Sequence, residues 1–201
     1  MTAQLQVGAW LAFWAACCSL LAGRPLPPDI KIRFETLFVP ALAVGLAATI
    51  LREPGRAFLE GSAAVMLVSA GIVDSRTGYL FDAVTLPCAA ICTLASILSQ
   101  SAWEAAATVL VLVMPLAALA SISRGNWLGW GDVKACFSLA VAFGPIEAPA
   151  TLFIATLSGL LSACISSKRR RTIPFGPHLA RGAVLTLILA PLAHRLEAFV
   201  R

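Results

Sequence analysis

The chain has 201 residues, of which 59% are apolar and only 12% are charged. Ordinary soluble domains carry about 25% charged residues, and a mean hydropathy of +0.87 is too high for a globule with a mostly polar surface. This composition excludes a soluble enzyme, a disordered regulator and a nucleic-acid-binding domain. It predicts a polytopic membrane protein with lipid as its main solvent.

Up to eight apolar segments follow one another along the chain. They cover roughly residues 5–22, 37–51, 58–73, 83–99, 104–121, 133–144, 150–166 and 178–195. A spanning helix needs about 20 mostly apolar residues, so the shorter segments leave a count of six to eight transmembrane helices. Lipid forces backbone groups to pair within each segment, and the alternating segments of a β-barrel, about ten residues each, do not appear. We therefore predict an all-α membrane helix bundle, with residues 1–201 as a single domain.

The basic residues predict how this bundle is oriented. No Lys or Arg precedes Arg24, so the first segment is expected to be a retained helix and not a cleaved signal. With eight spans and the N-terminus outside, ten basic residues lie in inside loops and four in outside loops. Cytoplasmic loops of membrane proteins typically carry such an excess of Lys and Arg. The excess also accounts for the net charge of +5 without a nucleic-acid partner. It places the loops at 74–82 and 124–132 in the cytoplasm.

Three of the four aspartates lie where predicted helices end, beside the membrane. Asp74 ends an apolar run, where both lipid and the helix dipole disfavour a carboxylate, and pairing with Arg76 is one explanation. Asp82 and Asp132 each precede an apolar run and could be N-caps. Asp132 also follows Gly129-Trp130-Gly131, whose glycines allow a close approach of another helix or of an extended substrate.

Two juxtamembrane carboxylates on one side of the membrane suggest a specific chemistry. Carboxylates a few Å apart cannot both ionise easily, so they share a proton, and one can activate water while the other polarises a carbonyl. This aspartic-protease chemistry needs no metal and no cofactor, and we expect neither. The six cysteines form no C-x-x-C pair, and His178 and His194 are too far apart for an obvious metal site.

Three motifs, in order, resemble those of the type IV prepilin peptidases. Asp74, followed eight positions later by Asp82 and the run Ala83-Val84-Thr85-Leu86-Pro87, is similar to the first signature of that family. Gly129-Trp130-Gly131-Asp132-Val133-Lys134 resembles the second signature, G-x-G-D-x-K, and Pro174-Phe175-Gly176-Pro177 resembles its PFGP element.

The resemblance implies an aspartic endopeptidase of the bacterial inner membrane. Such enzymes cut the short basic leader from prepilins or pseudopilins at the cytoplasmic face, so prepilin and lipid are the expected partners. It implies that Asp74 and Asp132 are the catalytic pair. The residues implied as supporting or substrate-binding are Asp82, Gly129, Gly131, Lys134, Pro174 and Gly176.

Two departures from the family pattern carry expectations of their own. Phe81 stands where the family usually has Pro, so the loop before Asp82 is expected to have another shape. Larger members carry paired C-x-x-C motifs in a segment associated with N-methylation. This chain has no such motif, and in this respect it resembles the short, peptidase-only members that serve tight-adherence (Flp-type) pili.

Two alternatives remain open at this point. Intramembrane acids often mark the ion or proton path of a transporter, although Glu104, Glu147 and Glu197 also lie near segment ends. A G-x-G-D protease with a substrate other than a pilin is the second alternative.

Overall fold

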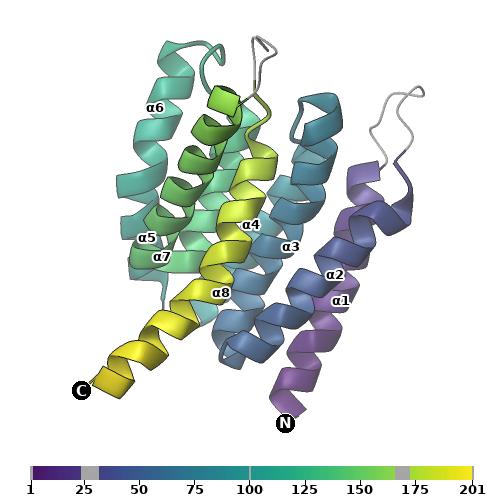
Figure 1. Cartoon of the computed structure of the whole chain (residues 1–201), viewed down its shortest axis with the longest axis vertical. Coiled ribbons are helices and arrows are strands. Elements are labelled where there is room, and N and C mark those ends of the chain that lie inside the picture. The colour runs from purple at the N-terminus through teal and green to yellow at the C-terminus, as the bar shows by residue number, and fades with distance from the viewer. Residues whose placement is uncertain (1, 24–31, 100, 166–172, 201) are drawn as a thin grey trace.

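The computed structural model describes residues 2–23, 32–99, 101–165 and 173–200, and contains no strand within these ranges. Its helices are α1 (Thr2–Gly23), α2 (Phe34–Leu51), α3 (Pro54–Thr77), α4 (Asp82–Leu98), α5 (Ala102–Thr108), α6 (Met114–Ile122), α7 (Trp130–Ile165) and α8 (Gly176–Val200). A five-residue π-helical stretch, Val109–Val113, joins α5 and α6 into one continuous helix. The predicted all-α bundle is confirmed (Figure 1).

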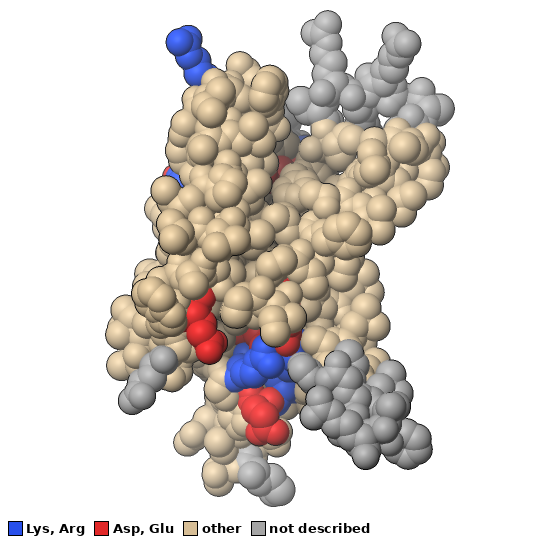
Figure 2. All heavy atoms as spheres, turned by 90° about the vertical axis from the view of Figure 1, so that its left-hand side faces the viewer, with Lys and Arg blue, Asp and Glu red and all other residues tan. Residues whose placement is uncertain are grey.

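Five helices of the described chain are long and apolar enough to cross a membrane. They span Thr2–Leu21, Phe34–Leu51, Pro54–Thr77, Ala102–Ile122 and Trp130–Ile165, with shorter apolar helices at Asp82–Leu98 and Gly176–Leu192. Figure 2 shows one face of the bundle, on which the visible charged side chains gather towards the two ends and leave the middle uncharged. An uncharged band of this kind suits contact with the hydrocarbon core. The fold is that of a polytopic membrane protein.

The helix α7 is a hairpin of two arms. At Gly144 the backbone leaves helical geometry, with φ of 71° and ψ of −171°, and Pro145 follows. Asp132 at the start of the first arm lies beside Asp74 near the end of α3, whereas Glu147 just after the turn contacts Arg52 at the opposite end of α3. The first arm therefore runs from one end of the bundle to the other, and the second arm returns. The two arms correspond to the predicted segments 133–144 and 150–166.

The centre of the bundle is α3. It packs against α1, α2, α4, α7 and α8, and 83% of its most apolar window is buried, against 28% or less in the other four candidate spans. Small residues allow this crowding: a Cβ on Gly61 would lie only 2.8 Å from Leu11 Cδ1 and 3.0 Å from Ala48 Cβ. Gly78, with φ of 72°, ends α3, and its N–H donates to the carbonyl oxygen of Asp74.

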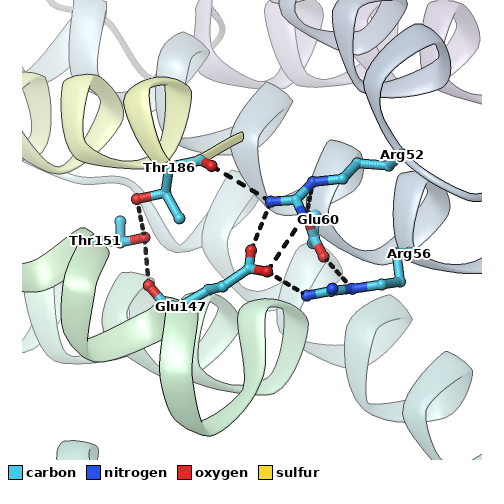
Figure 3. Close-up of polar contacts among 6 residues, drawn as sticks. All are labelled: Arg52, Arg56, Glu60, Glu147, Thr151 and Thr186. Carbon is cyan, nitrogen blue, oxygen red and sulfur yellow. Dashed lines mark hydrogen bonds and ion pairs between the residues drawn. The ribbon is translucent and has the colours of Figure 1, made fainter. Parts of the chain in front are cut away.

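An ion cluster of three buried side chains and one half-exposed arginine joins the helices at one end of the bundle (Figure 3). Arg52 lies 2.8 Å from Glu60 and 2.6 Å from Glu147, and Arg56 lies 2.7 Å from Glu60 and 2.6 Å from Glu147. Each arginine thus bridges both glutamates, which balances two positive against two negative charges. We call Arg52, Arg56, Glu60 and Glu147 the ion cluster. It ties the end of α2, the start of α3 and the turn of α7 together.

The ion cluster lies far from the aspartates of interest. Glu60 precedes Asp74 by fourteen residues in the same helix, which corresponds to about 21 Å at 1.5 Å per residue. This cluster was not expected from the sequence, although Arg56 and Glu60 are spaced i, i+4 at the start of an apolar segment. That spacing is a local signal for an ion pair. The link to Glu147, 91 residues from Arg56, has no such signal.

Candidate active site

Asp74 lies in the last turns of α3 and is almost fully buried, with 4% of its surface exposed. Its Oδ2 accepts a 2.8 Å hydrogen bond from the backbone N–H of Gly176, the first residue of α8. The amino end of a helix is a favourable partner for a carboxylate because its N–H groups are free and its dipole is positive there. This contact compensates for the unfavourable dipole of α3 itself.

The alternative explanation for Asp74, pairing with Arg76, is wrong in this structure. Arg76 is exposed, and the ion pairs of the described residues do not include one between these two side chains.

Two glycines bring α3 and α8 close enough for the contact with Asp74. A Cβ on Gly176 would lie 2.8 Å from Asp74 Oδ2, and a Cβ on Gly71 would lie 2.9 Å from the carbonyl oxygen of Gly176. Both distances are too short for any other residue without displacement. The predicted PFGP element therefore has a structural explanation: Pro174 leads into α8, and the carbonyl oxygen of Phe175 accepts the N–H groups of His178 and Leu179.

Asp132 comes from α7 and is partly exposed. It lies near enough to Asp74 for the charge of one carboxylate to act on the other. The N-cap prediction for Asp132 is wrong, because α7 begins at Trp130 and the N–H of Asp132 donates to the carbonyl oxygen of Gly129. Its carboxylate turns back towards Gly129 instead: a Cβ on Gly129 would lie 3.3 Å from Asp132 Oδ2. Gly129 leaves room for the carboxylate in that position.

Gly131 allows the start of α7 to touch the loop between α3 and α4. A Cβ at this position would lie 2.9 Å from the Cβ of Leu80 and 3.1 Å from its carbonyl oxygen. Gly131 does allow a close approach, but its partner is the loop that follows Asp74 and not another helix. This contact fixes the start of α7 beside the end of α3.

Asp82 and Lys134 form an ion pair at the edge of this site. The Nζ of Lys134 lies 2.7 Å from Asp82 Oδ1, and the two side chains are 34% and 56% exposed. The N-cap prediction for Asp82 is wrong, because α4 begins at Asp82 itself and is preceded by Phe81 without a side-chain cap. The pair joins the first turns of α4 and α7.

All eight residues singled out from the sequence lie at the same end of the bundle. The structure brings Asp74, Asp132, Gly129, Gly131 and Gly176 into one site, places Asp82 and Lys134 at its edge, and places Pro174 in the segment leading to it. His178, which was considered from the sequence only as a metal ligand, is 5% exposed and hydrogen-bonded to Ser158. Its place at the start of an apolar segment was the available signal for a buried role.

Comparison with known proteins places the chain in one family. Residues 62–164 match the type IV leader peptidase family. A "Type 4 prepilin-like proteins leader peptide-processing enzyme" from Escherichia coli O78:H11 is 31% identical over 192 residues, covering 92% of this chain and 69% of the relative. No solved structure matches.

Two further relatives are longer than this chain. Each is a "Prepilin leader peptidase/N-methyltransferase" from Burkholderia pseudomallei, strains 1026b and K96243, and each is 29% identical over 160 residues. The match covers 73% of this chain and 51% of the relative, so it spans about half of their length. The family match and the similarity to the Escherichia coli relative agree, and the chain belongs to the type IV leader peptidase family.

Proposed function

We propose that this protein is a membrane aspartic endopeptidase that removes the leader of prepilins or pseudopilins, with Asp74 and Asp132 as its catalytic pair. The observation that carries the proposal is that these two carboxylates, on helices α3 and α7, lie at the same end of the bundle and near enough to influence each other electrostatically. Asp74 is buried against a backbone N–H, whereas Asp132 is partly exposed. Two neighbouring carboxylates in different surroundings are suited to opposite proton-transfer roles.

The hydrogen bond from Gly176 favours the ionised form of Asp74, and in the proposed reaction Asp132 carries the shared proton at the start. In the proposed reaction a water molecule gives one proton to Asp74 while its oxygen attacks the scissile carbonyl carbon. Asp132 gives its proton to the carbonyl oxygen, which yields a tetrahedral diol. As the C–N bond breaks, Asp74 returns its proton to the leaving nitrogen, and a diol hydroxyl returns a proton to Asp132. The pair is then restored.

The position of the pair suits a substrate that is partly in the membrane. Asp74 lies near the end of one candidate span and Asp132 near the start of another. When the apolar helix of a substrate lies in the bilayer, the peptide bond between that helix and a polar leader lies at the same membrane depth as Asp74 and Asp132. The names of the relatives point to prepilin leaders as that substrate.

We place this end of the bundle on the cytoplasmic side. Arg33, Arg76 and Arg124 lie at the helix ends on the side of Asp74, since α2 starts and α3 and α6 end there, and Lys134, which pairs with Asp82, lies near the start of α7. At the opposite end, Arg52 and Arg56 are neutralised within the ion cluster. An excess of unpaired basic residues is typical of the cytoplasmic side. Arg24, Lys31 and residues 168–171, which entered the sequence-based count, lie outside the described residues.

A cleavage assay with the full chain in membranes tests the proposal. The chain is co-expressed with a prepilin encoded beside it, and leader loss is followed by gel shift and by the mass of the new N-terminus. We expect cleavage by the wild type and loss of at least about 10³-fold in Asp74→Asn and Asp132→Asn. Both variants should keep the wild-type melting temperature in detergent.

The same assay separates the finer parts of the proposal. Undiminished cleavage by a folded Asp132→Asn variant would rule out the pair. Cleavage of another membrane protein, with every candidate prepilin left intact, would favour a protease with a non-pilin substrate. We propose peptidase activity without N-methylation, because the chain contains no C-x-x-C motif. A product heavier by one methyl group would contradict that part alone.

A further inference from the structure

His178 lies in the first turn of α8 and makes a defined contact with the second arm of α7. Its side chain is buried, and its Nδ1 lies 2.9 Å from Ser158 Oγ. The Ser158 hydroxyl also lies 2.9 Å from the carbonyl oxygen of Ala155, to which it donates. A serine has a single hydroxyl hydrogen. The hydrogen of the contact with His178 therefore comes from the imidazole, and the Nδ1–H donates to Ser158 Oγ.

The imidazole ring is also fixed by packing. A Cβ on Gly159 would lie 3.7 Å from both Cγ and Cδ2 of His178, which is ordinary contact distance. The glycine thus leaves space for the ring to lie close to the backbone of α7. One hydrogen bond and one flat packing surface hold the ring, and through it the first turn of α8, in a single orientation.

The orientation of this turn determines where the N–H of Gly176 points. Gly176 precedes His178 by two residues in the same turn, and its N–H lies 2.8 Å from Asp74 Oδ2. The Cα atoms of a helix lie about 2.3 Å from its axis, so a rotation of about 20° displaces them by about 0.8 Å. A hydrogen bond stretched to about 3.6 Å is effectively lost. Small rotations of α8 would therefore remove the contact with Asp74.

We propose that His178 is a positioning residue for peptide cleavage. It fixes the first turn of α8 against Ser158, and this turn holds the Gly176 N–H on the Asp74 carboxylate. The hairpin α7 then positions both members of the catalytic pair: Asp132 directly from its first arm, and Asp74 through Ser158 on its second arm. The inference rests on the proposed function, because it requires Asp74 to take part in catalysis.

The test compares four variants of the full chain in the prepilin cleavage assay. His178→Phe keeps a ring of similar size without the N–H, and His178→Asn keeps an N–H near the position of Nδ1. Ser158→Ala removes the acceptor. Thr156→Ala is the matched control, since its exposed hydroxyl lies on the same arm and bonds only to carbonyl oxygens of its own helix. The measurements are kcat, KM and the melting temperature in detergent.

We expect kcat to fall 10- to 100-fold in His178→Phe and in Ser158→Ala, because a displacement of about 1 Å at a catalytic group costs up to about 10²-fold. KM should stay within twofold. His178→Asn should recover most of the activity, and Thr156→Ala should match the wild type. The double variant Ser158→Ala/His178→Phe should lose no more than the worse single variant, since the two residues act as a unit.

The inference is overturned if Ser158→Ala and His178→Phe both keep kcat within twofold of the wild type. It is also overturned if kcat per folded molecule is unchanged and only the folded fraction falls, which is the outcome for a purely structural histidine. If His178→Phe does not fold, the kcat of Ser158→Ala tests the inference by itself. This variant removes only one oxygen atom and so disturbs the packing little. Cleavage by Asp74→Asn would instead overturn the proposed function and this inference with it.

Discussion

The backbone N–H of Gly176 donates a 2.8 Å hydrogen bond to Oδ2 of Asp74, across 102 positions of sequence. This one contact connects the amino end of α8 to the carboxyl end of α3. It satisfies a buried carboxylate that would otherwise face the negative end of its own helix. It also gives Asp74 surroundings that differ from those of Asp132, although the two residues share a site.

The absence of a side chain at position 176 is necessary for this contact. We expect Gly176→Ala to lower the cleavage rate by at least about 100-fold, because the new methyl group would lie only 2.8 Å from Asp74 Oδ2 and would force the carboxylate or α8 to move. The measurement is kcat with the prepilin substrate. Gly55→Ala is the matched control: no atom lies within 4 Å of a Cβ there, and its activity should equal that of the wild type. Full activity in Gly176→Ala would contradict the assigned contact.

The turn of the α7 hairpin depends on another glycine. At Gly144, φ of 71° with ψ of −171° is a conformation that side-chain-bearing residues rarely adopt. We expect Gly144→Ala to lower the free energy of unfolding by about 1–3 kcal/mol, measured by denaturation in detergent. Gly8→Ala, where a Cβ would make ordinary contact at 3.8 Å from Thr49 Cγ2, should leave stability unchanged or slightly higher. Equal stabilities for both variants would rule out the turn as described.

The ion cluster is expected to govern stability rather than chemistry. Removing one member leaves charged partners buried without compensation, so Glu60→Ala should lower the free energy of unfolding by about 3–5 kcal/mol. Arg56→Ala should cost less, because its side chain is 48% exposed. Since Glu60 is about 21 Å along α3 from Asp74, kcat per folded molecule should stay near the wild-type value.

The control for the ion cluster is Glu104→Gln, whose exposed side chain forms no ion pair in the described part of the chain. Its unfolding curve should superimpose on that of the wild type. If Glu60→Ala unfolds at the same denaturant concentration as Glu104→Gln, the cluster contributes nothing to stability and its assigned role is wrong.

The exposed pair Asp82–Lys134 is expected to make only a modest contribution. The side chain of Asp82 is 56% exposed and that of Lys134 is 34% exposed, and such pairs contribute about 0–1 kcal/mol. Asp82→Ala should retain cleavage within about tenfold of the wild type, in contrast to Asp132→Ala. The exchange Asp82→Lys/Lys134→Asp keeps the pair with its charges reversed. It should therefore restore the cleavage activity and stability that the single variant Asp82→Lys loses. A complete loss of cleavage in Asp82→Ala would show that Asp82 has a direct part in the reaction.

Local sequence was sufficient to predict the helical class and most helix positions, because apolar length and the lack of charge are read residue by residue. The eight predicted segments match the helices once α5 and α6 are joined and α7 is divided at Gly144. Short motifs, through the family resemblance, also pointed to Asp74, Asp132 and Gly176 as parts of one candidate site. Local rules were less useful at the helix ends, where the N-cap interpretation offered as one alternative for Asp82 and Asp132 was wrong.

Only the tertiary structure decided which groups surround each charge. The partner of Asp74 is a backbone N–H more than a hundred residues away, the partners of Glu147 come from α2 and α3, and the partner of His178 is a serine on the second arm of α7. These contacts depend on how closely the helices approach. That distance is set by the glycines and small side chains between packed helices, and a linear pattern does not reveal which helices will meet.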